Sequence, residues 1–500
     1  MPKVLSVILL IILSFIFSSC KVSSTPQATV ARSTASGEVM SQTSIPGKVP
    51  FTPTDTSAPP TPSDTPVPPT PTQTPARTGL NATGPYVIFE AHNGLWITNP
   101  DGSFPTRLSD FEITSALDLH QNISPTGERM AVVVSNDQGL DLVLIKIPSG
   151  EAETITHLID RPAPDAYDPT SPNSFATYAI RDYDSIAWQP GDGRLLAFIG
   201  AIDGTTADLY LYDTQTKQIT QLTDGPSQAV LPVWSPDGQY ILHFGVSWVP
   251  PFGGAIGGAN QLDGVWAVQA SDGKVITLPK PEGSLPHFVG WQDDSHYLTY
   301  GAGECGSQNL FSVDIVSGES APVVGASFTD EIAMSPENGA FLFYSEGGCM
   351  GSQSEGVFLL SVGENTPIQL LEKRAWEIYW LPESKVFDAY PEALLSSNGQ
   401  TRYDPPVYES SYEPAVSKEG YQAWEVIQNQ NGRVVVRVPG GEWQSILNGS
   451  VDELIWDPVD GKTLLVALDD GSLYAASYPE FAPRLIGSLG VGVNQVIWSP

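Results

Sequence analysis

A short motif recurs along most of the chain and constrains its fold more than any other feature. The clearest copy runs from Val233 to Leu242, where an apolar segment ending in Trp234 is followed by Ser-Pro-Asp-Gly and a second apolar segment. In such a turn proline presets φ, aspartate bonds to its own backbone and glycine accepts a positive φ. Each copy therefore predicts a β-hairpin. Degenerate copies lie at 123–127, 187–193, 290–294, 334–339, 379–382, 416–420, 455–458 and 497–500.

The spacing of these copies predicts a β-propeller. The proline or its equivalent stands at 125, 190, 236, 293, 336, 382, 418, 458 and 500, with gaps from 36 to 65 residues and mostly near 43. Short apolar segments between the turns give four strands per repeat, without a long helical pattern. We expect an all-β propeller of about eight (seven to nine) four-stranded antiparallel blades. Nine starts suggest nine blades, but the weak copies near 382 and 418 could form one irregular blade.

The two ends of the repeat region predict a closed ring. Residues 495–500 read as a first strand with half of its turn, and nothing follows them. Residues 86–90 read as a second strand that lacks a first strand before it. We therefore expect the C-terminal strand to complete the N-terminal blade.

The repeat resembles the TolB-like, WD-repeat-related propellers of the bacterial envelope, most specifically at 234–238. The resemblance covers 86–500 and implies a propeller in a periplasmic or surface setting. TolB works by protein–protein contact, but this chain has a Thr/Pro-rich segment in place of TolB's separate α/β domain. TolB's particular partners are therefore not carried over.

The N-terminus has the pattern of an export signal. A cationic start is followed by the apolar run 4–17 and then by Phe17-Ser18-Ser19-Cys20. The run has the length of a signal-peptide core. Its end resembles the lipobox of bacterial lipoproteins, although Phe17 departs from the usual leucine. The resemblance implies a signal peptide at 1–19, acylation of Cys20 and an extracytoplasmic protein held at a membrane of the cell envelope. A plain secretory signal with an incidental cysteine is the alternative.

Composition separates a tether from the folded part. Residues 20–80 carry Cys20 and a Thr/Pro/Ser-rich stretch that cannot bury enough apolar surface to fold. We expect a disordered tether there and the propeller at 81–500. The formal net charge of −33 argues against nucleic acid as a partner, and against docking on an anionic bilayer by charge. Membrane contact is expected through the lipid alone.

Two cysteines stand in matching places of adjacent repeats. Cys305 and Cys349 each lie between the expected second and third strands of their repeat. An oxidising compartment favours a disulfide between them. The alternative is two free thiols that are aligned because the repeat was duplicated.

No sequence motif predicts catalysis, a cofactor or a metal. The six histidines are scattered without metal-ligand spacing, and Asp293-Asp294 and Asp469-Asp470 read as solvated turns. A Gly-x-Ser-x-Gly elbow and a phosphate-binding loop are both missing from the sequence. We therefore expect no catalytic residue, no cofactor and no metal ligand.

Insertions predict one elaborate face. Residues 160–182 and 246–263 interrupt the repeat at connections that emerge on the same side of a propeller as the two cysteine loops. Loops on a rigid scaffold commonly carry binding sites. Trp248 and Phe252, in a Gly-rich loop, are candidate binding residues for a protein or a sugar. Alternatively they cover the central channel as a plug.

These observations favour a binding module over an enzyme. We expect a non-enzymatic, lipid-anchored propeller that binds an envelope protein or a cell-wall glycan through its loop-rich face. The alternative is a glycan-active hydrolase or lyase with acidic residues at the channel mouth, because side chains can converge in space without a motif. Carboxylates that converge in the structure favour the enzyme, and a flat aromatic rim favours the binding module. A purely structural head is a third reading.

Overall fold

The computed structural model describes residues of the second of two units, Thr74–Pro500. Described are 79–500 apart from 92–93, 110, 112–118, 162–171, 182, 205, 250–258, 279–287, 303–307, 324–328, 335–340, 346–355, 362–365, 374, 376, 382–385, 391–392, 409, 489–494 and 500. The predicted signal peptide and nearly all of the predicted tether lie outside these residues, so that organisation stays a prediction. Among the described residues, no helix is long and apolar enough to span a membrane.

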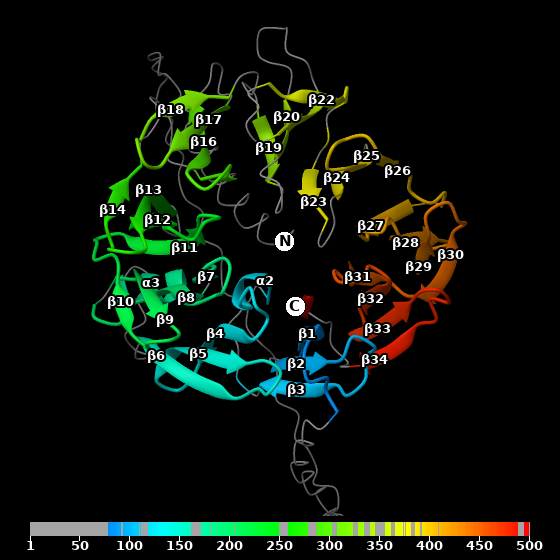
Figure 1. Ribbon diagram of the computed structural model, residues 1–500, viewed down its shortest axis with the longest axis horizontal. Coiled ribbons are helices and arrows are strands. Elements are labelled where there is room, and N and C mark those ends of the chain that lie inside the picture. Colours follow the sequence, from blue (N-terminus) through cyan, green and yellow to red (C-terminus); the bar gives the residue numbers. More distant parts are fainter. Residues whose placement is uncertain are drawn as a thin grey trace, which may run out of the picture. The chain divides into compact units, whose positions relative to one another are not determined.

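The described strands form eight antiparallel sheets of four strands and a ninth of three. They follow one another around a ring in chain order (Figure 1). The prediction of an all-β propeller with about eight four-stranded blades is confirmed. The three-stranded sheet is β4 (Arg129–Ser135), β5 (Gly139–Lys146) and β6 (Ala152–Asp160). At its inner edge Ile123 forms an isolated bridge to Met130, in the place that a first strand takes elsewhere.

Each of seven blades is built from four consecutive strands. They are β7 (Ile186–Trp188), β8 (Leu195–Gly200), β9 (Asp208–Asp213), β10 (Ile219–Gln221); β11 (Gln228–Trp234), β12 (Tyr240–Val249), β13 (Ala259–Gln269), β14 (Val275–Thr277); β15 (Gly290–Trp291), β16 (His296–Ala302), β17 (Gln308–Asp314), β18 (Ser320–Pro322); β19 (Thr329–Met334), β20 (Phe341–Ser345), β21 (Gly356–Leu360), β22 (Ile368–Leu371); β23 (Glu377–Trp380), β24 (Val386–Tyr390), β25 (Ala393–Ser396), β26 (Arg402–Tyr403); β27 (Ser410–Val416), β28 (Gln422–Gln428), β29 (Asn431–Arg437), β30 (Gln444–Asn448); and β31 (Val451–Trp456), β32 (Thr463–Leu468), β33 (Ser472–Ser477), β34 (Arg484–Ser488). Two short helices, α2 (Leu119–Asn122) and α3 (Pro172–Arg181), lie between blades.

The remaining blade closes the ring. It has the order β3 (Thr106–Ser109), β2 (Gly94–Thr98), β1 (Tyr86–Ala91), β35 (Gln495–Ser499). The C-terminal strand β35 pairs antiparallel with β1, with Val87 opposite Trp498. The predicted closure, in which the chain's last strand completes its first blade, is confirmed.

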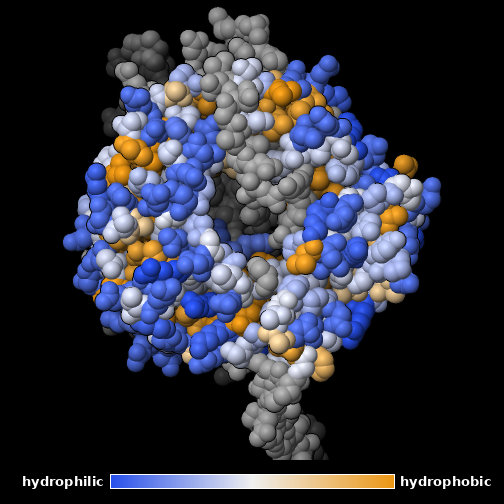
Figure 2. Space-filling view, viewed as in Figure 1, coloured by the Kyte–Doolittle hydropathy of each residue, from blue (hydrophilic) through white to orange (hydrophobic). Residues whose placement is uncertain are grey.

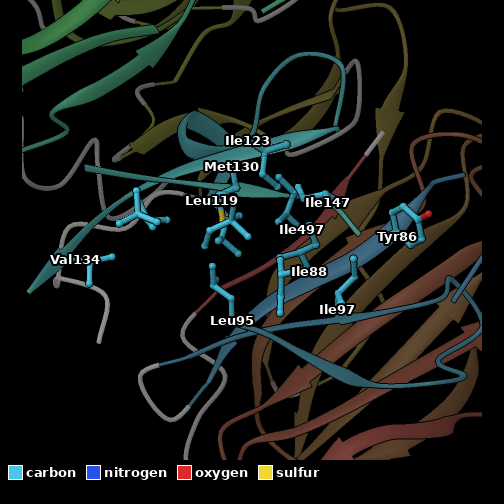
Figure 3. Packing of buried hydrophobic residues seen from close by; sticks show 14 residues of the cluster. Tyr86, Ile88, Leu95, Ile97, Leu119, Ile123, Met130, Val134, Ile147 and Ile497 are labelled. Carbon is cyan, nitrogen blue, oxygen red and sulfur yellow. The ribbon is translucent and has the colours of Figure 1, made fainter. Parts of the chain in front are cut away.

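Apolar faces of neighbouring blades pack against each other and hold the ring together. Ile88, Leu95 and Ile97 of the closing blade lie in one buried cluster with Met130 of β4 (Figure 3). Burial of such side chains contributes about 25 cal/mol per Å² of apolar surface. A single blade leaves both faces exposed, so these strands are stable only when stacked.

The recurring tryptophan also links blades by a hydrogen bond. Four of these indoles donate Nε1–H to a backbone carbonyl of the preceding blade or, for Trp188, of α2, which precedes the Ile123 bridge. In each case the acceptor immediately precedes the residue that takes the tryptophan's place in the preceding copy of the motif. The pairs are Trp188 to Asn122 (2.8 Å), Trp234 to Ala187 (2.9 Å), Trp380 to Ala333 (3.1 Å) and Trp456 to Ala415 (3.2 Å). The motif thus specifies the contact between blades as well as the turn.

The turn itself has the geometry that its residues predict. Asp237 Oδ1 accepts from the Ser235 hydroxyl at 2.6 Å, and that hydroxyl oxygen accepts from the Tyr240 amide at 3.0 Å. Gly238 has a φ of 69°, which a side chain would oppose. The Ser-Pro-Asp-Gly turn therefore connects β11 to β12.

Candidate active site

The structure does not describe the side chains of the candidate residues that the sequence singled out. Cys20, Phe252, Cys305 and Cys349 are among the residues not described, and of Trp248 only the backbone is described, within β12. Lipidation, the disulfide and binding through Trp248 and Phe252 therefore stay predictions. The site described next was not predicted by residue number.

Asp388 occupies a position that is apolar in every other blade. In each blade the residue at the tryptophan position of the motif, here Trp380, pairs with a residue of the second strand, here Phe387. The position compared is the residue that follows this partner, here Asp388. The equivalents are Ile88, Ala131, Ala197, Leu242, Leu298, Leu342, Ala423 and Leu465. Asp388 is only 6% exposed. A buried carboxyl at an otherwise apolar position costs stability, which points to a functional role.

Tyr379 accompanies this carboxyl and is equally specific to its blade. It lies directly opposite Asp388 in the β23–β24 pairing, and its hydroxyl donates to Asp388 Oδ2 at 3.0 Å. Directly opposed residues of antiparallel strands lie on the same face of a sheet. The residues at the Tyr379 position in the other blades carry no hydroxyl: Asn122, Ala187, Val233, Gly290, Ala333, Ala415, Ile455 and Ile497. One blade therefore contains the pair as a unit.

The next blade presents a second carboxyl from a β-bulge. The pairing of β27 with β28 shifts between Tyr412 and Ala415, and Glu413 has a φ of 44° before Pro414. A residue with a side chain pays about 1–2 kcal/mol for such a left-handed conformation. β-Bulges redirect side chains and are over-represented next to active sites. Leu231 in β11, with a φ of 54° before Pro232, shows the same bulge without the charge.

Neighbouring carboxylates contribute to the raised pKa values of Asp388 and Glu413. We call Glu377, Asp388, Glu413, Glu425 and Asp452 the acidic cluster. Burial raises the pKa of Asp388 to about 6, the charges of Glu413 and Glu377 add to this rise, and the Tyr379 hydroxyl opposes it. The pKa of Glu413 is raised first by desolvation and then by Glu425 and Asp452, although solvent still reaches its side chain.

Glu425 extends the cluster towards the following blade. It is 7% exposed, and its Oε1 accepts from the Val451 amide at 3.3 Å. Burial raises its pKa, the bond from Val451 lowers it, and the charge of Asp469 raises it. Acidic side chains of three consecutive blades thus influence one another.

Positive charge is directed elsewhere on the described surface. No lysine or arginine contributes to the pKa of Asp388, Glu413 or Glu425. Described cations instead pair with other carboxylates, in Lys146–Glu151, Arg194–Asp213 and Lys217–Glu153. Within the described residues, no group of His, Cys, Asp and Glu side chains is arranged to hold a metal ion.

Two members of the cluster belong to the inner strands of their blades. Glu377 and Glu413 belong to β23 and β27, which lie nearer the centre than the other strands of their blades (Figure 1). Figure 2 shows a hollow at this centre.

A second buried aspartate has a structural explanation. Asp208 is 2% exposed, and burial raises its pKa. Its carboxylate accepts from Thr206 at 2.9 Å, from Thr223 at 3.0 Å and from the Gly225 amide at 3.3 Å. These bonds join the start of β9 to the segment after β10, so Asp208 holds the blade's edge.

Ser295, His296 and Asp314 meet at a turn but do not form a nucleophilic triad. The Ser295 hydroxyl lies 3.2 Å from His296 Nδ1, and Asp314 lies 3.6 Å from Nε2. His296 Nδ1 is also 3.0 Å from both carboxylate oxygens of Asp293. Nδ1, the nitrogen that faces Ser295, is therefore engaged by the Asp293 carboxylate and is not a dedicated base for the serine hydroxyl.

Comparisons with known proteins name enzymes among the similar proteins. No protein-family model matches this chain. The chain is 47% identical over 55 residues to a Bacillus subtilis (strain 168) protein named "Uncharacterized peptidase YuxL", a match that covers 11% of this chain and 8% of that protein. Similar solved structures include Porphyromonas gingivalis dipeptidyl peptidase 4 (10% identity, 75% of this chain, 60% of that one, TM-score 0.46). They also include an oligogalacturonate lyase from Vibrio parahaemolyticus (10%, 81%, 87%, 0.34) and TolB from Acinetobacter baumannii (14%, 74%, 82%, 0.24).

The fold is a β-propeller of four-stranded antiparallel blades. The chain spans less than a tenth of the length of the curated relative, so that protein's activity is not carried over directly. The relative is nevertheless named a peptidase, and this contradicts our prediction of a non-enzymatic binding module. The prediction relied on the absence of a contiguous catalytic motif, and residues that converge from separate strands leave no such motif.

Proposed function

We propose that this propeller is a glycan-active enzyme, a hydrolase or a lyase, with Asp388 and Glu413 as its reactive carboxyls. The observation that carries the proposal is the Tyr379–Asp388 pair. In this blade only, Asp388 stands where the other blades have an apolar residue, and Tyr379 stands where they have a residue without a hydroxyl. The bulge at Glu413 supports it, because the adjacent blade accepts a left-handed backbone at a second carboxyl.

The two carboxyls suit acid–base cleavage of a glycosidic bond. Such cleavage requires one protonated carboxyl that protonates the leaving oxygen and one ionised carboxylate that activates water, attacks the sugar or removes a proton. Burial holds a large fraction of Asp388 protonated in mildly acidic solution, because its pKa is raised to about 6. Solvent-exposed Glu413 then acts as the carboxylate.

Charge selects among glycans. No lysine or arginine is among the groups that shift the pKa of Asp388, Glu413 or Glu425. A polyuronate would bring further negative charge into the same hollow and would be repelled. We therefore propose a neutral or amino-sugar-containing glycan as the substrate.

The proposal also includes the location expected from the sequence. The lipobox-like residues that end in Cys20 support an enzyme anchored at the outer side of a bacterial membrane. A cell-wall or surface glycan would lie within reach of such an anchor.

The test compares the full-length chain with Asp388→Asn and Glu413→Gln on neutral, amino-sugar and polyuronate glycans between pH 5 and 8. Asp208→Asn serves as the matched control, because it alters a buried aspartate with a structural role. We expect new chain ends from the neutral or amino-sugar glycans with the wild type and with Asp208→Asn, and a loss of at least a hundredfold in the two site variants.

A peptide library run beside the glycans tests the second candidate, which the peptidase name of the curated relative favours. Peptide cleavage that is lost in Asp388→Asn would make the site a peptidase and contradict the glycan assignment. Glycan cleavage that persists in Asp388→Asn would move the reactive site elsewhere.

A further inference from the structure

We infer that Tyr379 is the positioning residue of this site: it engages one oxygen of Asp388 and leaves the other oxygen to meet the substrate. The inference rests on the proposed function and assigns a separate role to a residue that does not itself react.

The ring of Tyr379 is fixed from two sides. Its own strand places it opposite Asp388, on the face of the sheet that meets the next blade. There it packs against the buried cluster that contains Val416, Trp424 and Val426. A ring confined in this way holds its hydroxyl at one place, so the 3.0 Å bond to Oδ2 also fixes the carboxyl plane.

The direction of this hydrogen bond determines where the acid proton of Asp388 resides. Burial raises the pKa of Tyr379 far above its usual range, and the nearby carboxylates add to this rise. The phenol therefore stays protonated and donates to Oδ2. A proton on Asp388 is then favoured on Oδ1, because the carbonyl oxygen of a neutral carboxyl accepts a hydrogen bond better than its hydroxyl oxygen does. Oδ1 is the oxygen that transfers the proton.

Packing alone does not explain the hydroxyl. Alanine, valine and isoleucine stand at the equivalent position in other blades, so the fold accepts residues of several sizes there. Phenylalanine would fill the volume of Tyr379 without its oxygen. The hydroxyl is required only because Asp388 lies opposite.

The test is Tyr379→Phe, with Tyr297→Phe as control. Tyr297 is 2% exposed, and burial alone accounts for its raised pKa. Two quantities are measured on the full chain: the titration of the Asp388 carboxyl carbon by NMR, assigned with Asp388→Asn, and the pH profile of kcat and KM. Loss of a bond to the ionised carboxyl is expected to raise the pKa of Asp388 by about one unit. The alkaline limb of kcat should move up equally, while kcat falls at least tenfold and KM changes little.

The outcomes separate this inference from the proposed function. If the wild type cleaves glycans and Tyr379→Phe keeps both kcat and the pH profile, Tyr379 is only structural and the inference is overturned, while the function stands. If the wild type shows no activity, the function and the inference are both overturned. A shifted titration would then show only that Tyr379 is hydrogen-bonded to the buried Asp388 carboxyl. A shift in Tyr297→Phe as large as that in Tyr379→Phe would also overturn the inference.

Discussion

Replacing the buried pair by apolar residues should stabilise the propeller in a pH-dependent way. The variant is Tyr379→Phe/Asp388→Leu, because leucine stands at the Asp388 position in β12, β16, β20 and β32. Removing both partners avoids an unsatisfied hydroxyl, whose burial costs about 1–3 kcal/mol. The pH-dependent difference in free energy of unfolding between the two chains is then the cost of ionising Asp388 in the folded wild type.

The pKa of Asp388 sets the magnitude. Its folded value is raised from 3.8 to about 6, so the folded chain binds this proton more tightly than the unfolded chain does. Stability is therefore lost as the pH rises from about 4 through 6, and at pH 8 the loss is about 3 kcal/mol. The leucine variant lacks this loss. Its advantage in free energy of unfolding should grow by about 2–3 kcal/mol between pH 4 and pH 8.

Urea unfolding of both chains at pH 4, 6 and 8 tests this prediction. Differences in packing between leucine and aspartate add an offset that does not depend on pH, so the comparison uses only the change with pH. An advantage of the same size at pH 4 and pH 8 would show that Asp388 titrates normally in the folded chain. That result would refute the reasoning that places a raised pKa at this site.

Four further outcomes follow from the structure. The rate of glycan cleavage should fall above about pH 6, as Asp388 loses its proton, and a rate that keeps rising to pH 8 in steady-state assays would contradict its role as acid. Trp456→Phe should lower the free energy of unfolding by about 1–2 kcal/mol more than Trp498→Phe in urea titrations, because both indoles are 2% exposed but only Trp456 has a hydrogen-bond partner. Glu413→Gly should raise stability by up to about 1 kcal/mol by relieving the left-handed backbone and should abolish cleavage, whereas Leu231→Gly at the corresponding bulge should stay active. Ser295→Ala and His296→Ala should each keep the cleavage rate within about twofold, because the histidine faces carboxylates at both nitrogens.

The architecture was predictable because its signals are local and repeated. The Ser-Pro-Asp-Gly turn requires particular φ angles at its proline and glycine. The tryptophan before the turn, Trp234 in the intact copy, marks the end of the blade's first strand. The closing strand was predictable from the half-repeats at the two ends. The three-stranded sheet was not, because Ile123 lies in a motif copy like the others but forms only an isolated bridge.

The candidate site was harder to predict, because its evidence lies in differences between repeats. Asp388 is unremarkable in Val-Phe-Asp-Ala-Tyr until the strand register shows that the other blades place apolar residues there. Glu413 becomes significant only through the positive φ that its bulge imposes before Pro414. An alignment of the repeats by their motif tryptophans would have shown the first signal from sequence alone. The second required the structure.

The central claim is that Asp388 is an acid that cleaves glycans. The most direct test measures new chain ends released from neutral and amino-sugar glycans at pH 5.5 by the wild type, Asp388→Asn and Asp208→Asn at equal folded concentration. The account predicts release by the wild type and Asp208→Asn, and at least a hundredfold less by Asp388→Asn. Equal release by Asp388→Asn and the wild type, or no release by any of the three chains, would contradict it.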